Sequence, residues 1–224
     1  MQVAENIKTI TSRLPDYVTL VAVSKTKPES MIMDAYQAGH LDFGENKVQD
    51  LAEKYEHLPK DIRWHFIGHL QTNKVKYIAP FIHLIHGVDS LKLLRTIDKE
   101  GEKNKRVISC LLQLKIAEEE SKFGLSKGDI TALLASEEFR SFQNLNITGL
   151  MGMASYVEDE NQINREFATL KSFFSELKET VLSNDPGFKF LSMGMSGDYE
   201  LAIKNGSNMV RIGSSIFGER HYNK

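Results

Sequence analysis

The sequence has only one cysteine, Cys110, so no disulfide can form within the chain. Its 28 basic and 30 acidic residues give a net charge of -2, which offers no basic excess for a nucleic-acid backbone. No apolar run approaches the roughly 20 residues that a membrane-spanning helix needs, and residues 1–12 lack the apolar core of a signal peptide. We therefore expect a cytoplasmic protein whose main partner is neither a nucleic acid nor a membrane.

Short apolar runs rich in β-branched residues alternate with longer amphipathic stretches along the chain. The runs, each expected to form a strand, cover residues 17–24, 41–43, 64–67, 82–88, 106–116, 145–151, 188–193 and 209–212. Helical stretches follow nearly all of them: one after Pro28, then about 46–55, 72–78, 90–103, 127–136, 161–182 and 198–205. Repeated strand–helix units predict a parallel sheet covered by helices, and strands buried on both faces read as continuous apolar runs, as these do.

Eight such units predict an α/β fold, a closed (β/α)8 TIM barrel, in a single domain spanning residues 1–224. The stretch before Pro15 is expected to add a helix at the N-terminus. A doubly wound open sheet is the structural alternative, because the number of strands does not by itself show closure. The sequence contains no recognisable linker, low-complexity segment or second domain.

Glycine and serine follow the seventh and eighth strand candidates, where barrels often bind phosphate. Residues 194–198 read Gly-Met-Ser-Gly-Asp, and Arg211 is followed by Ile-Gly-Ser-Ser. Glycine lets backbone N–H groups approach an anion, and serine adds a hydroxyl donor. Either loop alone reads as an ordinary turn, but the two together, in the two places that the fold assigns, favour a phosphate site.

Lys25 ends the first, strongly apolar strand candidate, so its side chain is expected at the mouth of the barrel. Partial desolvation and the nearby Lys27 both disfavour the ammonium form, and a neutral lysine forms imines with aldehydes. A solvated lysine at a strand end is the ordinary alternative. An amine and an anion site in one barrel mouth suit a phosphorylated aldehyde, for which pyridoxal 5'-phosphate (PLP) and sugar phosphates both qualify.

Metal ligands and reactive thiols give weaker signals. His65 and His69 are four residues apart, but their segment looks like a strand and its exit, where this spacing gives a metal no shared face. No Cys/His/Asp cluster typical of zinc stands out, and Cys110 is expected to be an inert packed thiol. We therefore predict no metal site.

Five motifs, in the expected order, resemble the signature set of the PLP homeostasis proteins. They are Val-Ser-Lys-Thr-Lys-Pro at 23–28, Phe-Gly-Glu-Asn at 43–46, Trp-His-Phe-Ile-Gly-His-Leu-Gln at 64–71, Met-Gly-Met-Ser at 193–196 and Val-Arg-Ile-Gly at 210–213. The resemblance covers almost the whole chain. It implies a single barrel similar to the N-terminal domain of alanine racemase, which is PLP fold type III.

The resemblance also assigns roles to individual residues. It makes Lys25 the Schiff-base lysine and Lys27 a second lysine that helps to transfer the cofactor. It places Arg211 at the pyridine nitrogen, where a donor-only guanidinium favours an unprotonated ring and a poorer electron sink; a salt bridge across the barrel top is the alternative. The other cofactor-binding residues that it implies are Asn46 beside the ring, Ser196, Gly213 and Ser214 at the phosphate, and Ser192 and Met195 in the same loop.

The resemblance finally implies a protein that holds PLP for vitamin B6 homeostasis and delivery, with no catalytic residue of its own. Racemases of this fold have a second domain that supplies a tyrosine, and a tyrosine closely follows their lysine, whereas Thr26 and Lys27 follow Lys25 here. Two-base racemisation would therefore lack a partner. We expect a monomer that meets apo-enzymes transiently; a minor amino-acid racemase or lyase, and a sugar-phosphate aldolase, are the alternatives.

Overall fold

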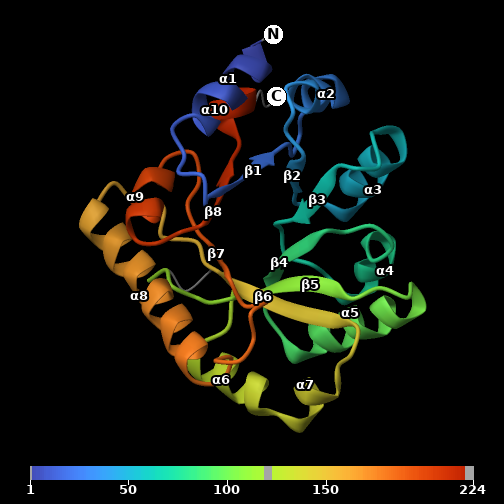
Figure 1. Cartoon of the computed structure of the whole chain (residues 1–224), viewed down its shortest axis with the longest axis vertical. Coiled ribbons are helices and arrows are strands. Elements are labelled where there is room, and N and C mark those ends of the chain that lie inside the picture. The colour runs from blue at the N-terminus through green and yellow to red at the C-terminus, as the bar shows by residue number, and fades with distance from the viewer. Residues whose placement is uncertain (1, 119–122, 220–224) are drawn as a thin grey trace.

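The computed structural model describes residues 2–118 and 123–219, and its strands close into one parallel barrel (Figure 1). Each strand pairs with the next along the chain, and β1 pairs with β8 to complete the ring. The strands are β1 (Thr19–Val23), β2 (Asp42–Glu45), β3 (Arg63–Phe66), β4 (Leu84–Val88), β5 (Ile108–Gln113), β6 (Leu145–Met151), β7 (Phe190–Ser192) and β8 (Met209–Ile212). The predicted TIM barrel is confirmed, and the open-sheet alternative is wrong.

Helices surround the barrel and connect successive strands. They are α1 (Gln2–Thr11), α2 (Glu29–Gln37), α3 (Val48–His57), the 3-10 helix η1 (Thr72–Lys74), α4 (Val75–Ile78), α5 (Leu91–Lys103), α6 (Lys127–Ala135), α7 (Glu137–Ser141), α8 (Glu160–Glu179), α9 (Tyr199–Lys204) and α10 (Ser214–Phe217). The sequence predicted all of these except the short α7 and α10. The extra N-terminal helix is confirmed, and it packs against α2 and α10, beside the C-terminal end of the described chain (Figure 1).

Local sequence explains where the two longest helices begin. The Ser90 hydroxyl accepts the Leu93 N–H at the start of α5, and the Asp159 carboxylate accepts the Asn161 N–H at the start of α8. α8 then buries an apolar stripe at helical spacing against the barrel. Of the helices that the structure describes, none has the length and apolar character needed to cross a membrane.

Residues alternate along each strand between the helices outside and the barrel interior. Trp64 and Phe66, two of the largest fully buried side chains, belong to the main core between the barrel and its helices. A second, smaller apolar cluster comes from strands all around the ring and therefore lies inside it: Val21, Leu84, Leu111, Met151 and Met209. Beside this cluster the interior is polar, and that polar part leads to the functional site.

Candidate cofactor site

A cavity of about 720 Å³ lies where the loops after β1, β6, β7 and β8 converge. This volume is within the range of small-molecule sites. Seven of the nine residues predicted from the sequence line it, namely Lys25, Lys27, Met195, Ser196, Arg211, Gly213 and Ser214. The amine and the two loops rich in glycine and serine therefore share one cavity.

The two loops rich in glycine and serine are bonded to each other. The Gly213 N–H donates to the Ser196 hydroxyl at 3.1 Å, which joins the loop after β7 to the loop after β8. Gly194 has φ +98°, and a Cβ there would lie 2.6 Å from the Cβ of Ala202, so this turn requires glycine. Hydroxyl and backbone N–H donors of this kind are suited to a phosphate group.

Lys25 is presented by a tight and strained turn at the end of β1. The Lys27 N–H donates to the Ser24 carbonyl at 3.0 Å, which closes the turn around Lys25. Thr26 adopts φ 65°, a left-handed conformation that costs a β-branched residue free energy. The backbone on both sides of the lysine is thus fixed.

A buried ion pair holds the segment just before Lys25. The Lys54 ammonium donates to Glu45 Oε1 at 2.6 Å and to the Ser24 carbonyl at 3.0 Å, and the Ser24 hydroxyl donates to the same Glu45 oxygen at 2.6 Å. Burial raises the pKa of Glu45, although Lys54 and Ser24 oppose that shift. Helix α3 is therefore tied to the start of the Lys25 turn, a role of Glu45 that its motif did not reveal.

The second lysine holds the last described helix in place. The Lys27 ammonium donates to the carbonyls of Phe217, Gly218 and Glu219 at 3.0, 2.9 and 2.9 Å. These carbonyls end α10, the helix that begins with Ser214 in the loop after β8. Lys27 is thus an anchor for this part of the cavity wall, and its part in cofactor transfer stays a prediction.

Arg211 extends from β8 into the interior, where only 4% of its surface is exposed. Its Nη1 donates to the Ser192 hydroxyl at 2.6 Å and its Nη2 to the Gly152 carbonyl at 3.2 Å. Burial lowers the pKa of the guanidinium to about 10, with Asp198 opposing, so Arg211 stays a cation at neutral pH. Its hydrogen-bond partners are a hydroxyl and a carbonyl, so the described residues give no support to the alternative role of Arg211, a salt bridge across the barrel top.

Ser192 and Asn46 are the two predicted residues that do not line the cavity. Ser192 ends β7, paired with Met151 and Met209, so it lies in the strand just before the predicted phosphate loop, and its hydroxyl accepts from Arg211. Its contact with the cofactor stays a prediction. Asn46 follows β2, and its carbonyl lies so close to Gly68 that a Cβ there would sit 2.4 Å from the oxygen. Its contact with the cofactor ring stays a prediction.

Ser155 and Tyr156, in the loop after β6, also line the cavity and were not predicted. Glu166 of α8 accepts the Ser155 N–H at 2.6 Å and its hydroxyl at 2.7 Å. Burial alone would raise the pKa of Glu166, but these hydrogen bonds outweigh it and lower the pKa. The signal in the sequence was a carboxylate on the apolar stripe of α8, between Ile163 and Leu170.

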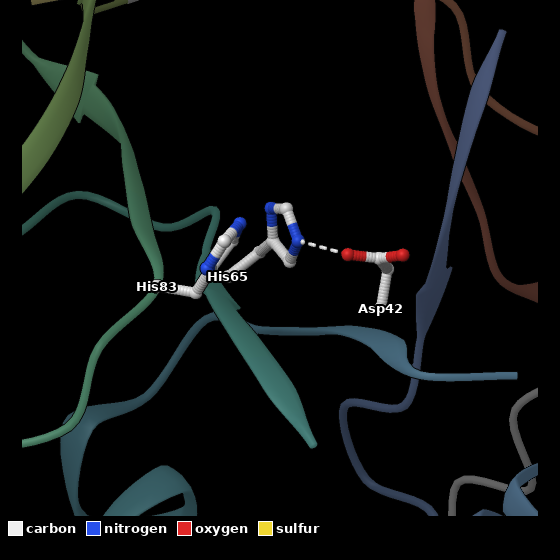
Figure 2. A group of neighbouring side chains, drawn as sticks. All are labelled: Asp42, His65 and His83. Carbon is white, nitrogen blue, oxygen red and sulfur yellow. Dashed lines mark hydrogen bonds and ion pairs between the residues drawn. The ribbon is translucent and has the colours of Figure 1, made fainter. Parts of the chain in front are cut away.

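Asp42, His65 and His83 form a cluster that the sequence did not reveal (Figure 2). Their ligand-type atoms lie within 4.8 Å of one another, which corrects the expectation that no such group exists. Arg63 donates to both Asp42 oxygens, at 2.8 and 2.5 Å, and His65 Nε2 lies 3.0 Å from Oδ1. Hydrogen bonds thus account for Asp42 and His65, while the His83 ring packs 5.3 Å from the His65 ring. The Arg63 cation beside Asp42 gives a divalent metal a poor environment.

The remaining histidine and cysteine predictions agree with the structure. His65 lies in β3, whereas His69 lies beyond the strand, bonded to Asp89 at 3.1 Å and stacked on Phe123. The two histidines share no partner among these contacts. Cys110 is fully buried in β5, and burial raises the pKa of its thiol, as expected for an inert packed cysteine.

A closed parallel barrel with a lysine, two loops rich in glycine and serine and a buried guanidinium around one cavity defines a class, the parallel barrels with a ligand cavity at the C-terminal ends of their strands. The family described as alanine racemase, N-terminal domain, matches residues 1–221. The pyridoxal phosphate homeostasis protein of Vibrio alginolyticus is 37% identical over 98% of both chains. The chain therefore belongs to the alanine racemase N-terminal domain family and, within it, to the pyridoxal phosphate homeostasis proteins.

Solved structures give the same result at the level of the fold. PipY of Synechococcus elongatus PCC7942 has been solved without PLP and with PLP bound, and it is 34% and 33% identical, with TM-scores of 0.90 and 0.87. Both comparisons cover 97% of this chain and 100% of PipY. Alanine racemase from E. faecalis is 16% identical with a TM-score of 0.77, over 98% of this chain and 58% of the racemase, which is a likeness of fold alone.

Proposed function

We propose that this protein binds PLP in the cavity, holds it as a Schiff base on Lys25, and serves PLP homeostasis and delivery without turning over a substrate. The observation that carries the proposal is that Lys25 lines the same cavity as Ser196, Gly213 and Ser214. The PLP-bound structure of PipY and the name of the Vibrio alginolyticus relative support it. They give the sugar-phosphate alternative no support.

The donors around the cavity fit the functional groups of PLP. The Ser196 and Ser214 hydroxyls, with backbone N–H groups near Gly213, would hold the phosphate, and Lys25 would supply the amine. When bound, PLP supplies an aldehyde that condenses with a primary amine. Arg211 would face the ring nitrogen, with Met195 and Asn46 as the other expected contacts.

Arg211 is the residue that argues against transaminase-type chemistry on a bound amino acid. Because a guanidinium only donates hydrogen bonds and stays charged, it favours an unprotonated ring nitrogen, which withdraws electrons weakly from a bound amino acid. The rival function, a minor racemase or lyase, has one observation in its favour: Tyr156 lines the cavity and is 96% exposed, so its phenol could act as an acid or base.

Two measurements on the PLP-loaded protein decide between these functions. Mixing it with an apo form of a PLP-dependent enzyme should restore that enzyme's activity, and the Lys25→Arg variant, which keeps a cation but cannot form an imine, should restore little. Incubation with amino acids in D₂O should incorporate no deuterium at Cα. Incorporation that is lost in Tyr156→Phe would establish the rival function instead.

We further infer that residues 1–224 form one cofactor-binding domain that acts as a cytoplasmic monomer and meets acceptor enzymes transiently. The packing of α1 against α10 supports one domain, because it joins the two ends of the described chain. A buried, unpaired Cys110 is in keeping with a reducing compartment. Light scattering of the PLP-loaded protein, alone and with an apo-enzyme, tests the assembly state.

A further inference from the structure

A continuous series of hydrogen bonds runs through the barrel interior from Arg211 to Asp42. Arg211 Nη1 lies 2.6 Å from Ser192 Oγ, and Ser192 Oγ lies 3.2 Å from His86 Nδ1. His86 Nε2 lies 2.9 Å from His65 Nδ1, and His65 Nε2 lies 3.0 Å from Asp42 Oδ1. We call Ser192, His86, His65 and Asp42 the polar relay.

The polar relay crosses the barrel and is shielded from water. Ser192 belongs to β7 and His86 to β4, strands that are not neighbours in the ring, so their contact spans the interior. Ser192 and His86 are 0% exposed, His65 is 1% exposed and Asp42 is 8% exposed. Barrel interiors are usually filled by branched apolar residues, and buried polar groups are costly unless every one is hydrogen-bonded. A fully bonded polar series in this place therefore needs a reason.

The charged groups at the two ends of this series, Arg211 and Asp42, fix which atom donates in the hydrogen bonds that they make. The Arg211 guanidinium can only donate, so Ser192 Oγ must accept from it and point its own O–H elsewhere, toward His86. Arg63 and His65 hold the pKa of Asp42 well below its usual value, despite burial, so its carboxylate can only accept. His65 must then carry a proton on Nε2.

The two histidines in the middle follow from these ends. Burial, with the Arg211 cation nearby, lowers the pKa of His86 well below its usual value, so His86 is neutral. If its Nδ1 accepts from Ser192, its single proton is on Nε2 and is donated to His65 Nδ1. His65 Nδ1, which lies 2.9 Å from that nitrogen, must then accept and carries no proton of its own. Each bond thus forces the direction of the next.

Resting on the proposed function, we propose that His86 and His65 are positioning residues for Arg211. They keep the Ser192 hydroxyl turned away from the guanidinium, so that Ser192 and the Gly152 carbonyl hold one edge of Arg211 and its remaining donors face the cavity and the PLP ring nitrogen. If His86 instead carried its proton on Nδ1, the Ser192 oxygen would accept from both His86 and Arg211, and its own O–H would lose its acceptor in the relay. Without the donation to His86 that polarises the hydroxyl, Ser192 would accept from Arg211 more weakly. The relay therefore positions Arg211, and with it the contact to the PLP ring nitrogen, through residues on the other side of the barrel interior.

The first test is made on the unaltered protein without PLP. Ring ¹⁵N chemical shifts of histidine-labelled protein distinguish a protonated nitrogen from a bare one, and His65→Asn and His86→Asn assign the two signals. At neutral pH both histidines should be neutral with the proton on Nε2. A proton on Nδ1 of either ring would overturn the proposal.

The second test uses paired amides as partial mimics of histidine. The asparagine amide oxygen occupies the δ position of a histidine Nδ1, and a glutamine amide reaches the ε position of Nε2. At residues 65 and 86 the relay needs an acceptor at the δ position, so both asparagine variants should keep PLP affinity within about twofold, whereas both glutamine variants should lose roughly tenfold, as for one buried charged hydrogen bond. A purely structural role predicts the opposite order, because asparagine leaves the larger cavity.

His83→Asn is the matched control. The His83 ring packs 5.3 Å from the His65 ring but takes no part in the relay, so PLP affinity should stay unchanged. Each variant is also melted without PLP, so that affinity is compared only among folded proteins. If unaltered protein forms no borohydride-stable link at Lys25, the proposed function fails; if the link forms but glutamine and asparagine variants bind PLP equally, only the relay fails.

Discussion

Lys27 is the residue at which the sequence and the structure suggest different roles, and two substitutions separate them. Lys27→Met removes the ammonium that donates to the three carbonyls at the end of α10. Lys27→Arg keeps a cation and several donors at the same place, but a guanidinium forms no imine with an aldehyde. An anchoring role predicts that arginine replaces lysine; a role as a second amine in cofactor transfer predicts that it does not.

The loss of stability expected for Lys27→Met follows from the hydrogen bonds that the substitution removes. Hydrogen bonds from a charged donor contribute about 1.5–3 kcal/mol in net terms, and the half-buried position of Lys27 favours the lower part of that range. We expect Lys27→Met to lose about 2 kcal/mol, which for a protein of this size lowers Tm by roughly 4–8 °C. Lys27→Arg should stay within about 2 °C of the unaltered protein.

The assay combines thermal unfolding with the rate at which PLP passes to an apo-enzyme. The anchoring role predicts a lower Tm and faster release for Lys27→Met, because the loop that begins at Gly213 loses its support, and near-normal values of both for Lys27→Arg. If Lys27→Arg melts normally but transfers PLP as poorly as a variant without any amine, Lys27 acts as a nucleophile and the anchoring account is refuted.

Three further predictions follow from single sites. Gly194→Ala should destabilise the protein by about 1–3 kcal/mol and weaken PLP binding, since φ is +98° and the new Cβ would meet Ala202. Gly197→Ala, with no atom within 4 Å of its Cβ, should leave the free energy of unfolding in urea unchanged. Because the folded-state pKa of His86 lies below its usual 6.5, the unfolded chain binds an extra proton as the pH falls below that value. The free energy of unfolding should therefore fall on acidification, and fall less steeply in His86→Asn. Equal slopes of the free energy of unfolding against pH in the two proteins would contradict this. Glu166→Gln should weaken PLP binding in a PLP titration, because Ser155 loses its carboxylate acceptor and the loop after β6 loosens. An unchanged affinity would contradict this and show that other contacts hold the loop.

Much of the fold could be predicted because its signals are local. Apolar runs and helix starts gave eight strands in the right order, and β6 and β8 have the predicted bounds. The runs at β5 and β7 extended beyond the observed strands, because apolar residues continue into the flanking loops. α7 and α10 were missed because helices of five and four residues carry too little periodicity.

The same distinction applies to the site: residues with a local sequence signal could be predicted, and contacts between distant segments could not. Lys25, Ser196 and Gly213 could be placed together because each follows a strand, and strand ends of a barrel meet at one mouth. The bond between His86 and Ser192 joins residues 106 positions apart, and it depends on closure of the barrel and on the register of β7. No pattern within either segment indicates it, apart from histidine at an inward position of a buried strand.

The central claim is that the Lys25 amine and the loops that carry Ser196 and Gly213 hold one molecule of PLP between them. Protein mixed with equimolar PLP is reduced with borohydride and digested, and the modified residue is identified by mass spectrometry, with Ser196→Ala run in parallel. The account predicts a phosphopyridoxyl group on Lys25 and a reduced yield in Ser196→Ala. A label on another lysine, or no label at all, would contradict it.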